Sequence, residues 1–184
     1  MLTKAAQQAI QTVPVWNGQN NTYNAKPMFP NDPVKNVDGT NRWVSFLNGN
    51  ILSSINVITA NNKNAGFHFG SGSTAATVDD YYLKTPITAY LSGVLNSFVR
   101  GVEGSKPYME ATITVTNTGT SSDITVAEIG IVTANIWVCT SNSATSASAN
   151  NMLFDRTVLE NPIVLTPLQT AAIRYRITCD MSFS

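Results

Sequence analysis

The end of the chain constrains the fold most, because its side chains alternate between apolar and polar over a dozen residues. The apolar set is Ala171, Ile173, Tyr175, Ile177, Cys179 and Met181, and the interleaved set is Ala172, Arg174, Arg176, Thr178, Asp180 and Ser182. A period of two is typical of a strand with one buried face and one solvated face. We therefore expect an antiparallel sheet that covers an apolar core.

The same pattern predicts further strands upstream. β-Branched residues alternate over 111–116, a turn cluster follows at 117–123, and an apolar run over 124–132 predicts the return strand of a hairpin. The alternation slips near Ala127 and Glu128, which indicates either a bulge or burial on both faces. Shorter strands are expected at 136–139 and 163–165. The segments 42–47 and 51–59 fit two strands, or a strand and a short helix, and 90–100 fits a helix or a strand. Together these segments predict a mainly β fold, an antiparallel β-sandwich of jelly-roll or Ig-like type.

The first 40 residues have a different character. They hold four of the eight prolines and many asparagines, so they offer few periodic apolar positions. We predict an extended N-terminal arm over 1–40, with a short helix within 2–10, and a β-sandwich domain over 41–184. The large apolar side chains of the arm need a surface to lie on, either on the chain's own domain or on a neighbouring subunit: Trp16, Tyr23, Met28 and Phe29.

The composition argues against several classes of partner. Lys and Arg number 11, Asp and Glu number 11, and charged residues make up only 12% of the chain. The polar surface comes instead from 20 Asn, 22 Thr and 16 Ser. Phosphate binding needs clustered basic residues, so we expect no nucleic acid partner. We expect no membrane association, because there is no apolar run long enough to span a bilayer and no basic amphipathic helix.

Residues capable of catalysis are few. His68 lies between Phe67 and Phe69, which favours a packed or hydrogen-bonded strand residue. The adjacent pair Asp79 and Asp80 favours a turn or a helix N-cap, since neighbouring strand side chains point to opposite faces. We predict no catalytic, cofactor-binding or metal-binding residue, no cofactor and no enzymatic activity.

The remaining residues with chemical potential have structural explanations. Cys139 and Cys179 are far apart and lack metal-site spacing, so we expect two small buried side chains and leave open whether they pair. Asp155 and Arg156 are expected to form an ion pair that fixes the loop after residue 150. Glu128 lies among apolar neighbours and needs a partner if it is buried.

Three segments resemble structural proteins of tailed-bacteriophage virions. The first is the stretch GSGSTAATVDDYYLKTPI at 70–87. The second joins ITVTNTG at 113–119 to ITVAEIGI at 124–131. The third joins LFDRTVL at 153–159 to PIVLTP at 162–167 and the closing strand. The chain departs from the pattern at Leu168, where a glycine is usual after the proline.

The resemblance implies an antiparallel β-sandwich that assembles in a virion and has no enzymatic activity. We therefore expect a capsid-surface (decoration) or fibre-anchoring protein, or a neck or tail component. It would be made in the host cytoplasm and assemble as a homo-oligomer, with the arm contacting other virion proteins. The alternative is a carbohydrate-binding β-sandwich for host-surface recognition, which would use exposed aromatic side chains and the 140–151 loop. Its aromatic platform would come from Trp16, Trp43 and Trp137, which otherwise belong to the core.

Overall fold

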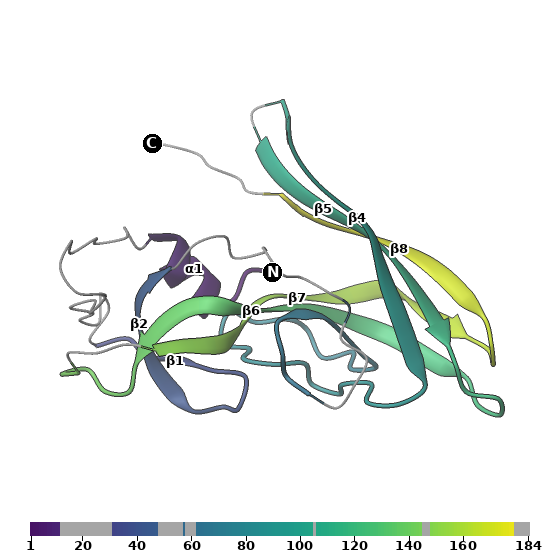
Figure 1. The fold of residues 1–184 in the computed structure, drawn as a ribbon, viewed down its shortest axis with the longest axis horizontal. Coiled ribbons are helices and arrows are strands. Elements are labelled where there is room, and N and C mark those ends of the chain that lie inside the picture. The colour runs from purple at the N-terminus through teal and green to yellow at the C-terminus, as the bar shows by residue number, and fades with distance from the viewer. Residues whose placement is uncertain (12–30, 48–56, 58–61, 105, 145–147, 179–184) are drawn as a thin grey trace.

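The chain folds into two antiparallel sheets that share one apolar core (Figure 1). The computed structural model describes residues 1–11, 31–47, 57, 62–104, 106–144 and 148–178. In those residues strands dominate, and the predicted mainly β sandwich is confirmed. The described helix is α1 (Lys4–Gln11), which begins directly after Thr3.

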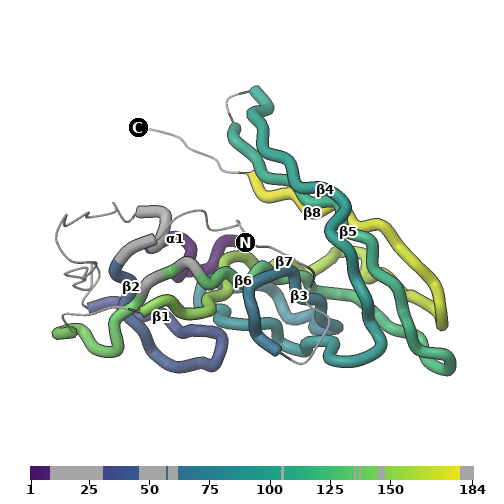
Figure 2. The backbone as a smooth tube through the Cα atoms, viewed as in Figure 1, coloured from purple at the N-terminus to yellow at the C-terminus, as the bar shows by residue number. Residues whose placement is uncertain are grey.

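The first sheet is built around two long strands, β6 (Ile124–Cys139) and β7 (Ser148–Leu165). One edge of β6 pairs with β7, and its other edge pairs first with β3 (Gly66–Gly70) and then with β2 (Asn41–Leu47). The short β1 (Val34–Lys35) completes this sheet beside β2. Figure 2 shows how the chain returns from β3 through residues 71–90 to the second sheet.

The second sheet has the order β4-β5-β8. It consists of β4 (Leu91–Glu103), β5 (Lys106–Asn117) and β8 (Thr170–Thr178). The tip of the β4–β5 hairpin stands clear of the first sheet, whereas the other end of the hairpin lies over it (Figure 1). The segment 90–100, whose pattern fits a helix or a strand, is therefore a strand from Leu91 onward.

The core lies between the two sheets. Alternate residues of the second sheet face side chains from β3, β6 and β7. The buried set from both sheets includes Phe67, Phe69, Ala111, Ile113, Val115, Ile129, Ile131, Phe154, Ile173, Tyr175 and Ile177. The predicted apolar face of the last strand is thus confirmed as far as Ile177. Cys179 and Met181 lie outside the described residues.

The predicted hairpin between 111–116 and 124–132 is wrong. β5 pairs with β4 and β8, and β6 pairs within the other sheet, so the turn at 117–123 carries the chain from one sheet to the other. Asn117 holds this crossing: its amide donates to the carbonyls of Ser122 and Leu165, and its side-chain oxygen accepts from the backbone N–H of Gly119. The predicted slip is confirmed as a register shift between Val126 and Glu128.

Both described ends of the predicted arm contact the first sheet. Leu2 forms a bridge with Asp155 on β7, and the N–H of Thr3 donates to the carbonyl of Phe154 at 3.1 Å. At the other end, β1, which lies within the predicted arm range, pairs with β2 of the first sheet. Residues 12–30 lie outside the described residues, so the boundary at residue 40 stays a prediction.

Candidate functional site

The most chemically distinctive place in the molecule is a buried ionic cluster around Arg156. This arginine lies on β7 and is fully buried. Its Nε donates to Glu128 Oε2 at 2.7 Å, and its Nη1 donates to Asp80 Oδ2 at 2.8 Å. Its remaining N–H groups reach Glu128 again and the carbonyls of Thr74 and Ala75. All five donors of the guanidinium therefore have acceptors.

The two carboxylates of the cluster also bind the backbone of the 71–87 loop. Glu128 accepts from the N–H of Thr85 at 2.7 Å and from the N–H of Lys84 at 3.2 Å. Asp80 accepts from the N–H of Thr77 at 2.9 Å and from the ammonium of Lys84 at 2.7 Å. The cluster thus attaches a long loop to β6 and β7 through charged hydrogen bonds, which are stronger than neutral ones.

Two glycines at the start of the loop make room for Glu128. A Cβ at Gly70 would lie 2.5 Å from Glu128 Oε1, and a Cβ at Gly72 would lie 2.6 Å from the same atom. Both distances are far inside van der Waals contact. The glycines of the 70–73 segment are therefore required by the close approach of a carboxylate of the same chain.

The charges of the cluster hold Asp80 ionised. Burial alone would raise the pKa of this carboxyl, but hydrogen bonds from Lys84, Thr77 and Arg156 outweigh burial and lower the pKa to about 2. A carboxylate with so low a pKa is a poor general acid or base near neutral pH. The arrangement serves charge neutralisation and loop attachment.

Asp155 and Arg156 do not pair with each other, contrary to the sequence expectation. As neighbours on one strand they point to opposite faces. Asp155 instead accepts a hydrogen bond from the hydroxyl of Tyr175, accepts another from Thr157 at 3.2 Å, and lies 3.0 Å from the Met1 ammonium. Burial and the nearby charge of Asp155 raise the pKa of Tyr175 well above its ordinary value.

His68 is a hydrogen-bonded strand residue, as predicted. It lies on β3, is 3% exposed, and its Nε2 is 2.7 Å from the carbonyl of Asn64. A carbonyl can only accept, so Nε2 carries the proton and Nδ1 accepts from the Tyr82 hydroxyl at 3.0 Å. Burial lowers the pKa of His68 despite the bond to Asn64, which keeps the ring neutral.

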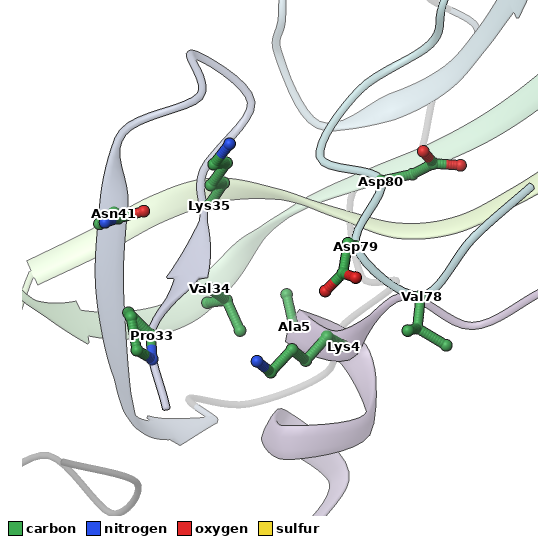
Figure 3. Close-up of a pocket in the computed structure, with 9 residues that line it drawn as sticks. All are labelled: Lys4, Ala5, Pro33, Val34, Lys35, Asn41, Val78, Asp79 and Asp80. Atoms are coloured by element: carbon green, nitrogen blue, oxygen red, sulfur yellow. The ribbon is translucent and has the colours of Figure 1, made fainter. Parts of the chain in front are cut away.

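Two surface clefts lie beside these clusters. The first, of about 200 Å³, is enclosed by α1, β1 and residues 78–80 (Figure 3). Its polar groups include Lys4, which pairs with Asp32, and Lys35, whose ammonium lies 5.3 Å from the centre of the Tyr81 ring. Asp79 is exposed and directs its carboxylate toward the cleft, whereas Asp80 turns away from it.

The second cleft, of about 310 Å³, is lined chiefly by amide and charged side chains: Asn36, Val37, Asp38, Lys63, Asn64, Ala149, Asn150 and Asn151. Lys63 spans the cleft, donating to the carbonyl of Val37 at 3.0 Å and to Asp38 at 3.2 Å. The side chain of Asn64 makes no described hydrogen bond and is exposed. Residues 149–151, which the sequence predicts as part of a loop over 140–151, belong instead to β7 and form one wall of a polar cleft.

Other predicted residues are placed as follows. Cys139 is a buried thiol, and burial raises its pKa. Cys179 and Trp16, together with the side chain of Trp137, lie outside what the structure describes, and Trp43 is half-buried. Within the described part of the chain, no cluster of His, Cys, Asp or Glu is arranged for a metal ion. Over the same residues, no helix has the length and apolarity to span a membrane.

The sequence does not predict the convergence of Asp80, Glu128 and Arg156. Glu128 was expected to need a partner, and that expectation is confirmed by Arg156. Asp80 was assigned to a turn, and its bonds to Thr77 confirm that role, but no described helix begins there. A usable signal existed: each of the segments 70–87, 124–131 and 153–159 contributes at least one charged residue to the cluster.

The comparisons with known proteins identify no relative. No protein-family model, no curated protein and no solved structure matches the chain.

Proposed function

We propose that this chain is a non-enzymatic structural component of a tailed-phage virion, assembling as a homo-oligomer on other virion proteins. A capsid-surface or fibre-anchoring position is favoured over a neck or tail position. The observation that carries the proposal is the use of the motif residues. Asp80, Glu128 and Arg156 come from the three segments that resemble virion proteins, and all three serve to hold the sandwich together.

The other candidates for chemistry have structural uses as well. His68 is neutral and holds Tyr82 and Asn64, and Asp155 holds Tyr175 and the first residues of the chain. A residue that is buried and fully hydrogen-bonded within its own fold is poorly placed to meet a substrate. These engagements support a role in which the chain contributes surfaces instead of a reaction centre.

The position of residues 1–3 supports the assembly part of the proposal. This segment adds to the free edge of β7, with Thr3 and Met1 hydrogen-bonding to Phe154 and Arg156. Addition of an extended segment to a sheet edge is also a common way for separate chains to associate. Here the edge of β7 accepts such a segment from its own chain, which shows that a sheet edge of this fold can take part in this kind of contact.

The test of the virion role is peptide mass spectrometry of purified phage particles from the genome that encodes this chain. We expect its peptides in particles after density-gradient purification, in a fixed ratio to the major capsid protein. Absence from particles that contain every other encoded structural protein would overturn the proposal. As a matched control, a non-structural protein of the same genome should disappear during purification.

The second candidate is a carbohydrate-binding module, favoured by the polar cleft beside residues 149–151. Amide and carboxylate groups there are suited to the hydroxyls of a neutral sugar. A glycan array is the test, followed by Asn64→Ala, which removes an exposed amide without breaking a described hydrogen bond. Loss of glycan binding in this variant but not in Asn142→Ala, on an exposed loop, would favour the second candidate over the first.

A further inference from the structure

We propose that β4 pairs antiparallel with β4 of a second copy of this chain, which joins the two second sheets into one continuous sheet. The inference deepens the homo-oligomer part of the proposed function by assigning it a surface. It rests on the open edge of the second sheet, on how the other edges are protected, and on where the charges of β4 lie.

β4 is a long strand that lies at an end of its sheet's order. It runs over Leu91–Glu103, and among the described residues its backbone pairs only with β5. Such an edge presents a row of N–H and C=O groups able to pair with another strand. The tip of the hairpin also stands clear of the first sheet, so its edge is approachable (Figure 1).

The other edges of the molecule are protected in ways that β4 is not. Residues 1–3 follow the edge of β7, and residues 85–87 follow the edge of β3 through Ser71 and Phe69. β8, the opposite edge of the second sheet, carries Arg174 and Arg176. By contrast, residues 91–99 of β4 contain no charged residue and no proline, which are two of the usual protections of an edge.

The charges of β4 select an antiparallel arrangement. Its only charged residues, Arg100 and Glu103, both lie near the hairpin tip. Parallel pairing in register would set each of them against its own copy, and like charges directly opposite are destabilising. Antiparallel pairing sets them against the uncharged half of the partner strand. It also closes the assembly as a two-fold dimer.

The apolar side chains of β4 agree with this arrangement. Val94 is 61% exposed, and Val99 is 46% exposed. The register irregularity between Leu95 and Ser97 divides the strand into two runs. Antiparallel pairing about this point places Val94 of one copy near Val99 of the other, where apolar cross-strand neighbours stabilise a sheet.

The test is the mass of the full-length protein by light scattering over a range of concentrations. We expect the wild type to have at least twice the 19.8 kDa chain mass. The variant Val94→Lys/Val99→Lys sets ammonium groups against each other across the proposed pair and should shift the protein to monomers, weakening association at least tenfold. Circular dichroism would check that the variant keeps its strand content.

The matched control is Val78→Lys/Val164→Lys, which introduces the same charges at two exposed valines outside β4. It should keep the wild-type mass. An oligomer whose mass survives the β4 substitutions would overturn the β4 pairing while leaving the homo-oligomer intact. A wild type that is monomeric at every concentration would overturn self-association, and the virion role would still be decided separately by the particle composition.

Discussion

At the scale of single residues, the fold depends on a guanidinium that has no contact with water. Arg156 balances Glu128 and Asp80, and each carboxylate also accepts backbone hydrogen bonds from the 71–87 loop. Removing one partner from a buried ion pair is strongly destabilising, because it leaves an uncompensated charge. The cluster is therefore where a single substitution should have the largest effect.

We predict that Glu128→Gln lowers the free energy of unfolding by about 3 kcal/mol, because the substitution keeps the shape but removes a charge that faces Arg156. Urea titration followed by circular dichroism measures this loss. The control is Glu160→Gln, at an exposed position of the neighbouring strand β7, which should change stability by less than about 0.5 kcal/mol. Equal effects from the two variants would contradict the importance of the buried pair.

A second prediction concerns pH. The folded chain holds His68 below its ordinary pKa, so at mildly acidic pH the unfolded chain binds the extra proton more readily than the folded chain does. Stability should be full above about pH 6.5 and decline as the pH falls below that value. Denaturation midpoints measured from pH 7 to 5.5 test this.

His68 is the only histidine in the sequence, which makes the control direct. The variant His68→Gln should be less stable than the wild type at pH 7 but should show little change in stability over the same pH range. If the stability of the wild type changed with pH as little as that of the variant, protonation of His68 would not be the cause of any loss of stability at acidic pH.

At the scale of elements, α1 depends on the residue before it. Thr3 is buried and caps the helix: its Oγ1 accepts from the N–H of Ala6 at 3.2 Å and donates to the carbonyl of Leu153 on β7. We predict that Thr3→Ala lowers stability by about 1 kcal/mol, the usual effect of losing a cap. Thr3→Ser, which keeps the hydroxyl, should retain most of the stability in the same urea titration, and equal losses would argue against capping.

Individual strands could be predicted from local pattern, whereas their partners could not. The alternation in β8 marks its buried face correctly through Ile177, because one face of that strand meets the core and the other meets water. The same kind of pattern in β5 and β6 led to an incorrect hairpin. Period two reports which side of a strand is buried, but not which neighbour lies beside it, and the side chain of Asn117 decides that the chain changes sheet.

The strands also extend beyond the segments expected at 124–132, 136–139 and 163–165. β6 runs through Ala134 to Cys139, and β7 runs through Pro162. Proline is tolerated there because the register shifts between Val126 and Glu128, so the ladder is already interrupted beside it. Local sequence patterns could not predict the ionic cluster for a related reason. Arg156 lies 28 residues from Glu128 and 76 from Asp80 along the chain, and only the fold brings them together.

At the scale of the whole molecule, the two sheets form one core and should unfold together. Ile113 on β5 is fully buried against side chains of the first sheet. We predict that Ile113→Ala lowers stability by about 2–5 kcal/mol. The loss should be reported equally by tryptophan fluorescence, to which Trp43 on β2 of the first sheet contributes, and by circular dichroism of all strands.

Coincident urea midpoints from the two signals, in the wild type and in Ile113→Ala, would show cooperative unfolding. The variant Thr178→Ser, at an exposed position of β8 in the same second sheet and outside the proposed β4 contact, serves as the control and should move neither midpoint appreciably. Two separate transitions would mean that the sheets are independent units and that the shared core contributes little to their association.

The close contact between Glu128 and the two glycines has a consequence for how related sequences can evolve. If a shorter side chain replaced Glu128, positions 70 and 72 would no longer need to be glycine to avoid its carboxylate. Arg156 would also lose the carboxylate that balances its buried charge. The positions 70, 72, 80, 128 and 156 should therefore change as a set during evolution. Such a set can reveal distant kinship between chains whose remaining residues have diverged beyond recognition.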